Sequence, residues 1–449
     1  MRGLVLLLLG GGLIWAVLHF FPSSEEPGGA GEPDVEEPGT PGTSVLGAER
    51  EATGGQPNGG QPSSGVPSTD PPSGGQPKDT APSPDAGGDA GGGFTVPVSQ
   101  ADLISLGSTL AHGSGQEVLD WLQASDHVLD ADMEWAMASF AAVLANDRGT
   151  ARERAQKISS EDALPQRVRW VLQRVLSGNF EGPWPAMLAG GDPLEVGLLI
   201  RTAVIEAAAL AERRRDPEAA ERLTFAFEHE LSALWPANFV SLNEWRELLD
   251  AAQARHRFNP KGSWPSHQMT VQSGDSLGAI RKRYLAEFPD RLINTGLIAK
   301  VNDIDPSLIH PDQVLRIPTA QVTMLVDLDA HWLLYYHDDE VVAAYPVGIG
   351  GTGEETIVGT FTIGEKQVEP TWFPRGRSPV VFGEDDNPLG TRYMTWFEDG
   401  EKTSYGFHGT WEPETIGGNE SDGCIRMYNH DVEEFFELVP LHTRFRVQP

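Results

Sequence analysis

Residues 405–429 read YGFHGTWEPETIGGNESDGCIRMYN and contain Cys424, the only cysteine in a chain of 449 residues. A single cysteine excludes an intramolecular disulfide, and it cannot supply a zinc site built from several thiolates. The thiol is therefore either a small buried apolar side chain or a nucleophile. His408 lies upstream at the end of an expected strand, and histidine is the side chain best suited to deprotonate a thiol near neutral pH.

The residues around Cys424 suit a nucleophile, but alone they are weak evidence for one, and composition favours a buried thiol. Gly423 permits a tight turn in which bare backbone amides face a developing oxyanion. Arg426 is able to bind a substrate carboxylate through two parallel hydrogen bonds. A buried thiol beside a surface histidine stays open as the alternative. A metal site on His408 and Cys424 is disfavoured, because no third and fourth ligand follow at recognisable spacing.

The N-terminal fifth of the chain predicts a membrane tether and a spacer. Within residues 1–21, an apolar run over 3–21 is long enough to cross a bilayer, with Arg2 in front and no further Lys or Arg before Arg50. We expect an uncleaved transmembrane anchor that places the later domains outside the cytoplasm; a cleaved signal peptide is the alternative, and it would export them as well. Residues 22–93 are rich in Gly, Pro, Ser and acidic residues, which predicts a disordered linker.

Residues 94–258 show apolar residues at helical spacing and predict an all-α domain of six to eight helices, a bundle or short solenoid. We expect five of its tryptophans to be core residues: Trp121, Trp135, Trp170, Trp235 and Trp245. Nothing in this region predicts catalysis, and binding of a protein partner is one role open to it. The formal net charge of -32 argues against a nucleic-acid partner for the chain as a whole.

Residues 267–319 predict a small module of strand, helix, helix and strand. Residues 269–271 alternate as a strand, and Ser276 is placed to cap the first helix. The buried side of that helix is marked by Leu277, Ile280 and Tyr284, and a second helix is expected around residues 293–302.

Residues 322–449 predict a mainly β domain with one late helix. Alternating stretches such as VTMLVDL and GTFTIGEKQV indicate strands, and Asp338–Asp339 indicates a hairpin turn. The helix is expected over residues 431–439, capped by Asn429 or Asp431.

The module at 267–319 resembles a LysM domain through TVQSGDSLGAI, VN and the closing IHPDQVLRIP. The resemblance implies binding to N-acetylglucosamine-containing glycans, peptidoglycan foremost. It also implies a sugar groove formed by two loops, with these expected residues: Gly274, Asp275, Ser276, Leu277, Asp305, Pro306 and Ile309. A degenerate LysM domain that serves as a packing spacer is the alternative.

Residues 322–449 resemble the L,D-transpeptidase (YkuD-type) catalytic domain through GTFTI, NPLGTRYM, HGT and SDGCIR. The resemblance implies that Cys424 is the nucleophile, that His408 is its general base, and that the Gly409 carbonyl orients the imidazole. Ser421 and Gly423 are expected to form the turn and the oxyanion site. The expected substrate-binding residues are Arg426, Asn429, Trp372 and Trp411. Core packing is an equal alternative for both tryptophans.

The implied reaction cleaves the terminal D-alanine from a tetrapeptide stem through a thioester and forms 3-3 cross-links, with no cofactor and no metal. An L,D-carboxypeptidase and attachment of a protein amine use the same acyl-enzyme. A non-catalytic wall anchor with an inert Cys424 is the alternative from another class. The expected location is the bacterial cell envelope, on the periplasmic side of the membrane. Many family members have histidine where this chain has Asp422, and an acid there would raise the pKa of the thiol.

Overall fold

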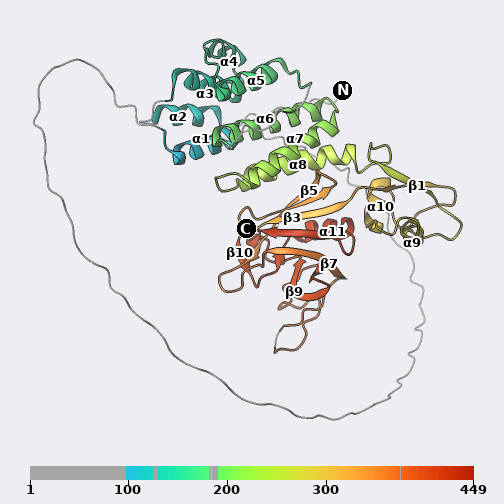
Figure 1. The fold of residues 1–449 in the computed structure, drawn as a ribbon. Coiled ribbons are helices and arrows are strands. Elements are labelled where there is room, and N and C mark those ends of the chain that lie inside the picture. The colour runs from blue at the N-terminus through green and yellow to red at the C-terminus, as the bar shows by residue number, and fades with distance from the viewer. Residues whose placement is uncertain (1–97, 125–128, 182–183, 185–190, 375) are drawn as a thin grey trace, which may run out of the picture. The chain divides into compact units, whose positions relative to one another are not determined.

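The computed structural model describes residues 98–449 except 125–128, 182–183, 185–190 and 375 (Figure 1). These residues belong to one compact unit, Phe94–Pro449. The expected transmembrane anchor at 1–21 and the linker at 22–93 lie outside the described residues. Within the described part of the chain, every helix is too short or too polar to cross a bilayer.

The helical region has eight helices among its described residues, in agreement with the expected six to eight. They are α1 (Gln100–His112), α2 (Gly115–Ala124), α3 (Ala131–Leu144), α4 (Arg148–Ala155), α5 (Ala163–Ser177), α6 (Pro193–Glu212), α7 (Asp216–Leu231) and α8 (Phe239–His256). Short polar side chains cap several of them; Ser99, for example, forms a capping box with Asp102 at the start of α1.

The tryptophans of this region pack as the apolar spacing predicts. Trp235 and Trp245 are buried. Trp121, Trp135 and Trp170 are partly buried against the core formed by α1–α6. Their indole rings therefore contribute to the core of the helical region.

The small module folds as strand, helix, helix and strand. Its elements are β1 (Ser266–Thr270), α9 (Leu277–Glu287), α10 (Thr295–Asn302) and β2 (Val314–Pro318), and β1 pairs with β2 antiparallel. The Ser276 hydroxyl accepts a hydrogen bond from the Ala279 amide, 3.2 Å away, so the predicted cap is confirmed. The three residues expected on the buried side of α9 are all buried.

The C-terminal region is mainly β, as expected. Its strands are β3 (Val322–Asp327), β4 (Trp332–His337), β5 (Glu340–Pro346), β6 (Ile349–Gly350), β7 (Gly359–Val368), β8 (Arg392–Glu398), β9 (Glu401–His408), β10 (Asn419–Ser421), β11 (Ile425–Arg426) and β12 (Arg444–Gln448). Eight of them form one sheet in the order β11-β9-β8-β7-β12-β3-β4-β5, and β10 pairs with β6. A short 3-10 helix, η1 (Pro413–Thr415), lies between β9 and β10.

The late helix α11 (Asn429–Leu438) begins before the predicted start, and the predicted cap is wrong. Tyr428 occupies the N-cap position and its side chain makes no capping hydrogen bond. The two expected capping side chains are engaged elsewhere. The Asn429 side-chain oxygen accepts from the Thr391 amide, and the Asp431 carboxylate binds Arg246.

The helical region covers the sheet edge at β5. Helices α7 and α8 both pack on this strand, and Figure 1 shows α8 running beside it. The Val341 amide donates to the Thr224 hydroxyl at 3.0 Å, and the Val341 carbonyl accepts from the Gln253 amide at 3.0 Å. Helical side chains thereby satisfy backbone groups that an edge strand would otherwise expose.

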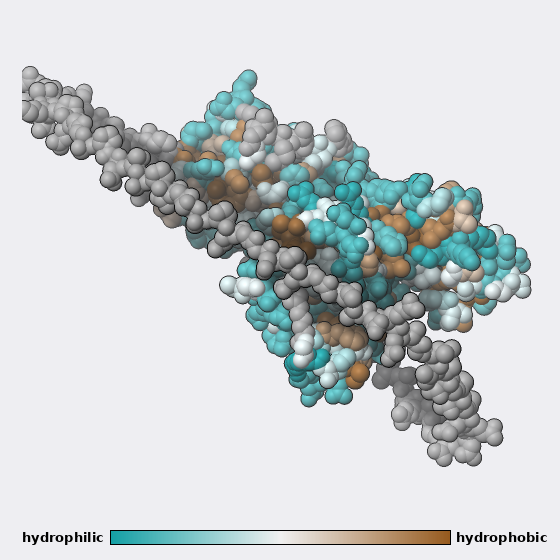
Figure 2. Space-filling model, turned by 60° about the horizontal axis from the view of Figure 1, so that its bottom comes forward, coloured by the Kyte–Doolittle hydropathy of each residue, from teal (hydrophilic) through white to brown (hydrophobic). Residues whose placement is uncertain are grey.

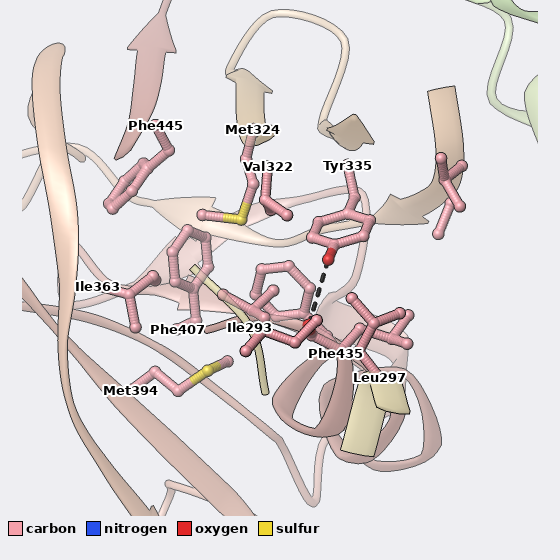
Figure 3. Close-up of a cluster of buried hydrophobic side chains, with 14 of the residues drawn as sticks. Ile293, Leu297, Val322, Met324, Tyr335, Ile363, Met394, Phe407, Phe435 and Phe445 are labelled. Carbon is pink, nitrogen blue, oxygen red and sulfur yellow. Dashed lines mark hydrogen bonds between the residues drawn. The ribbon is translucent and has the colours of Figure 1, made fainter. Parts of the chain in front are cut away.

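The small module shares an apolar core with the β domain. Figure 3 shows Ile293 and Leu297 of the module close to Tyr335 and Phe435 of the β domain, all within one cluster of buried side chains. On the face of the protein in Figure 2, apolar residues form separate patches among hydrophilic ones. The buried apolar clusters cross the boundaries between the regions of the unit.

Candidate active site

Cys424 and His408 lie at the β11 edge of the large sheet, one just before a strand and the other at the end of the neighbouring strand. His408 is the last residue of β9, and Cys424 immediately precedes β11. The two strands are parallel, with Arg426 opposite His408 and Ile425 opposite Phe407. The sheet therefore brings together the two residues whose chemistry the sequence singled out.

His408 is held as a neutral base. Its Nδ1 lies 2.6 Å from the Gly409 carbonyl oxygen. Because a carbonyl only accepts, Nδ1 carries the proton and Nε2 keeps its lone pair. Burial lowers the pKa of His408 to about 4; the hydrogen bond to Gly409 opposes this shift and the positive charge of Arg426 adds to it. At neutral pH the imidazole is uncharged and able to take a proton.

The Cys424 thiol is protonated at rest. Burial is the main cause that raises its pKa to about 11. The charge of Asp422 adds to that increase, while a hydrogen bond from the Gly406 backbone and the charge of Arg426 oppose it. The sulfur lies 3.9 Å from the Ser404 carbonyl oxygen. A protonated thiol and a neutral imidazole provide a nucleophile only when the proton leaves the sulfur during the attack.

The turn before the thiol requires glycine at position 423. Gly423 has φ +96°, and a Cβ atom there would lie 2.7 Å from the Tyr405 ring. The Ser421 hydroxyl donates to the Cys424 carbonyl at 2.5 Å, and the Ser421 carbonyl accepts from the Gly351 amide at 3.0 Å. Ser421 and Gly423 thus shape the turn, as expected.

Arg426 is less open to a ligand than the sequence suggests. Its Nη1 donates to the Glu412 carboxylate at 3.1 Å and to the Thr415 hydroxyl at 3.3 Å. Only 13% of its side chain is exposed, against 63% for Glu412. Arg426 acts on the site through its charge, since it lowers the pKa of both His408 and Cys424.

Asn429 supports the loop that carries the Gly409 carbonyl. Its Oδ1 accepts from the Thr391 amide at 3.2 Å. A Cβ atom built on Gly409 would lie 2.1 Å from this oxygen, and one on Gly390 would lie 2.3 Å from it. The two glycines therefore let the Asn429 side chain approach the backbone beside His408.

The two expected substrate-side tryptophans occupy different environments. Trp372 is half-buried in the loop between β7 and β8, where it exchanges two backbone hydrogen bonds with Val380, of 2.8 and 2.9 Å. Trp411 follows the His408 loop, is 51% exposed, and lies with its ring centroid 6.0 Å from that of Phe382. Core packing is therefore wrong for Trp411, while Trp372 contributes to the loop itself.

The residues expected to bind sugar lie on two loops of the small module. Gly274, Ser276, Asp305 and Pro306 are exposed. Leu277 is 3% exposed, so its side chain belongs to the core of the module and only its backbone faces the loop.

The remaining residues of these loops make local contacts. Asp275 accepts from the Gln272 amide at 2.8 Å and pairs with Arg283 at 3.0 Å, so its carboxylate stabilises the loop. Ile309 is half-buried against the shared core.

Sequence reasoning missed two neighbours of the thiol, Ser404 and Gly406. They lie on β9 just before His408, so the alternation of that strand was a signal that places Gly406 and His408 on one face. The ion pair between Arg426 and Glu412 could not be predicted in this way, because Glu412 lies in a loop without a regular side-chain pattern.

Comparison with known proteins identifies two domains in the chain. Residues 321–447 match the L,D-transpeptidase catalytic domain of the YkuD family, and residues 269–318 match the LysM domain. The putative L,D-transpeptidase YkuD of Bacillus licheniformis is 32% identical over 146 residues, which cover 32% of this chain and 73% of that protein. The probable L,D-transpeptidase ErfK/SrfK of Escherichia coli is 34% identical over 155 residues, covering 31% of this chain but 48% of that protein.

A solved L,D-transpeptidase from Mycobacterium smegmatis aligns with a TM-score of 0.24 and 20% identity, covering 31% of this chain and 64% of that one. A score this low adds nothing to the relationship that the sequences establish.

Proposed function

Because the chain belongs to the L,D-transpeptidase family of acyltransferases, we propose that it is a peptidoglycan L,D-transpeptidase with Cys424 as nucleophile and His408 as general base. The observation that carries the proposal is the hydrogen bond from His408 Nδ1 to the Gly409 carbonyl. It leaves Nε2 as the basic atom of an imidazole on the strand next to the thiol.

In the first step, the Cys424 sulfur attacks the carbonyl carbon of the third, diamino-acid residue of a tetrapeptide stem. The thiol proton passes to His408 Nε2, and the carbonyl electron pair moves onto the oxygen. When the tetrahedral intermediate collapses, the bond to the terminal D-alanine breaks. His408 returns its proton to the departing amine, and a thioester remains on Cys424.

In the second step, an amine of a neighbouring stem attacks the thioester carbonyl. His408 takes a proton from that amine and delivers it to the sulfur as the carbon–sulfur bond breaks. The products are a 3-3 cross-link and the free thiol. Water in place of the amine gives L,D-carboxypeptidase activity, and an amine of another protein gives attachment of that protein to the wall.

The pKa shifts support general-base catalysis over a preformed ion pair. A thiolate–imidazolium pair at neutral pH needs a thiol pKa below that of the imidazole. Here the thiol has a pKa of about 11 and the imidazole a pKa of about 4, so the neutral pair is favoured. Proton transfer therefore accompanies attack on the substrate.

The LysM domain supports peptidoglycan as the substrate. A glycan bound by exposed residues such as Gly274 and Ser276 would raise the effective concentration of stem peptides near Cys424. The apolar run at 1–21 and the acidic linker at 22–93 support a location in the cell envelope, with the catalytic domain on the outer side of the cytoplasmic membrane. The helical region packs against the sheet at β5. Binding of a protein partner by its outer helices is a second role that we propose for it.

The proposal is tested by acylation with a carbapenem, followed by intact-protein mass spectrometry. We expect one covalent adduct on the full chain and none on Cys424→Ala. A folded wild-type chain without an adduct would favour the non-catalytic wall anchor. Mass spectrometry of products from purified tetrapeptide stems then separates the outcomes: a 3-3 dimer indicates transpeptidation and a tripeptide alone indicates carboxypeptidation.

A further inference from the structure

Thr356 connects the loop after β6 to the turn that carries the thiol. Its hydroxyl lies 2.9 Å from the Gly350 amide and 2.9 Å from the Gly423 carbonyl oxygen. The amide only donates and the carbonyl only accepts, so the hydroxyl accepts from Gly350 and donates its single proton to Gly423. Thr356 is 6% exposed, so water does not compete freely for these bonds.

The position of Thr356 is itself tightly fixed. A Cβ atom on Gly350 would lie 2.1 Å from the Glu354 carbonyl oxygen and 2.6 Å from the Thr356 nitrogen. The loop therefore folds back closely on β6, and the Thr356 hydroxyl has little freedom to follow a change at Gly423.

The bond to Gly423 sets the direction of the next amide. The Gly423 carbonyl and the Cys424 N–H belong to one planar peptide group and point in opposite directions. A carbonyl held by Thr356 thus turns the Cys424 N–H away from Thr356.

Two other carbonyls of this turn are engaged as well, those of Ser421 and Cys424. The Ser421 carbonyl accepts from the Gly351 amide, and the Cys424 carbonyl accepts from the Ser421 hydroxyl. Over the described part of the chain, the Gly423 and Cys424 amides have no backbone or side-chain acceptor. Three carbonyl groups of the turn are therefore hydrogen-bonded within the protein, and two amide donors next to Cys424 have no protein acceptor among the described residues.

We propose that Thr356 is a positioning residue for the acyl-transfer reaction, and that its hydroxyl orients the Gly423–Cys424 peptide so that the Cys424 amide stabilises the oxyanion. This inference rests on the proposed function of Cys424. Thr356 acts through the peptide and does not touch the substrate. Nothing in the sequence around Thr356 marks it, because the partner that it orients lies in a distant segment.

Two thiol reactions separate this role from simple support of the fold. Acylation by a carbapenem passes through an oxyanion on the attacked carbonyl. Alkylation by iodoacetamide displaces iodide at a saturated carbon and develops no oxyanion. A residue that only keeps the thiol in place affects both reactions, whereas a residue that orients oxyanion donors affects acylation alone.

The experiment measures both rates on the full chain for four proteins: wild type, Thr356→Val, Thr356→Ser and Thr352→Val. Valine keeps the shape of threonine without the hydroxyl, and serine keeps the hydroxyl. Thr352 is an exposed residue of the same loop and is the matched control. We expect Thr356→Val to slow acylation by about 10- to 100-fold and to leave alkylation nearly unchanged, while the serine and control variants acylate at close to the wild-type rate.

Acylation of Thr356→Val at the wild-type rate, or an equal loss in both reactions, would overturn the inference. If valine prevents folding, as judged by circular dichroism, Thr356→Ala is compared with Thr356→Ser by the same two rates. A wild-type chain that is alkylated but takes up no carbapenem would contradict the proposed function itself. Normal wild-type acylation with an unimpaired Thr356→Val would contradict only the role of Thr356.

Discussion

Arg246 of α8 and Asp431 of α11 form a two-pronged ion pair that joins the helical region to the catalytic domain. One prong, from Arg246 Nη1 to Asp431 Oδ2, measures 3.0 Å, and the second joins Nη2 to Oδ1. The Asp431 side chain is 1% exposed and the Arg246 side chain 15% exposed. Asp431 lies in the first turn of α11, two residues after Asn429, so the pair also fixes the helix end beside the active site.

Removing Arg246 is expected to leave a buried carboxylate without its counter-charge. We predict that Arg246→Met lowers the free energy of unfolding by about 3 kcal/mol or more, measured by urea denaturation. Arg377→Met is the control, because Arg377 pairs with Asp386 at the surface and both side chains are mostly exposed; its effect should stay below about 1 kcal/mol. Equal effects of the two substitutions would contradict the importance assigned to the buried pair.

The stability of the protein should depend on pH through His408. Its pKa is about 4 in the folded chain, against about 6.5 when unfolded. Between these values the unfolded chain binds more protons, so stability decreases as the pH falls from about 6.5 to about 4. The full contribution is about 3 kcal/mol.

We expect His408→Gln to flatten the stability curve in that window, measured by urea denaturation at a series of pH values. His310→Gln is the control, because the His310 side chain is exposed. His337 is also fully buried with a lowered pKa, so part of the slope should remain in His408→Gln. An unchanged slope in His408→Gln would show that His408 is not held neutral in the fold.

Asp422 is expected to make the thiol less acidic. Its charge is one of the causes that raise the pKa of Cys424, with burial the larger one. We predict that Asp422→Asn lowers the pKa of the thiol by a fraction of a unit, measured from the pH dependence of iodoacetamide alkylation. The difference should shrink at high salt, because Asp422 is exposed. Glu420→Gln serves as the control, and an equal shift there would indicate a general charge effect.

Two glycines of the LysM domain should respond oppositely to alanine. A Cβ atom on Gly296 would lie 2.3 Å from the Glu437 carbonyl oxygen, whereas one on Gly278 would have only the Ser276 hydroxyl oxygen nearby, at 3.6 Å. We expect Gly296→Ala to destabilise the protein by about 1–3 kcal/mol, since α10 and α11 must separate. Gly278→Ala, in α9, should be neutral or stabilise it by about 0.5 kcal/mol. Thermal unfolding of both variants tests the pair.

Local patterns predicted much of this architecture. The alternation of VTMLVDL and GTFTIGEKQV corresponds to β3 and β7, and the Asp338–Asp339 turn separates β4 from β5. The short motifs around His408 and Cys424 led to the family because they combine a strand end, a glycine turn and a thiol. These features depend on residues close together in the chain.

Contacts between distant segments had no such signal. Arg246 and Asp431 are separated by 185 residues, and no periodicity links them. The cap of α11 was mispredicted for the same reason: Asn429 and Asp431 are good capping residues locally, but their distant partners engage both side chains. Thr356 was likewise invisible before its partners at Gly350 and Gly423 were known.

The contact between α10 and α11 affects how glycan binding by the LysM domain would relate to reaction of a stem peptide at Cys424. The Asn294 side chain donates to the carbonyls of Phe436, Glu437 and Val439, so the start of one helix closes the end of the other. The LysM domain and the catalytic domain therefore share an interface at this point. Two domains joined only by a flexible linker would have a hinge there instead. If the LysM loops hold a glycan strand, the thiol meets that strand at a set offset from the sugars held. The distance between the bound sugar and the attacked stem peptide would then be fixed. The position at which the LysM domain binds the glycan would determine which stem peptide reacts.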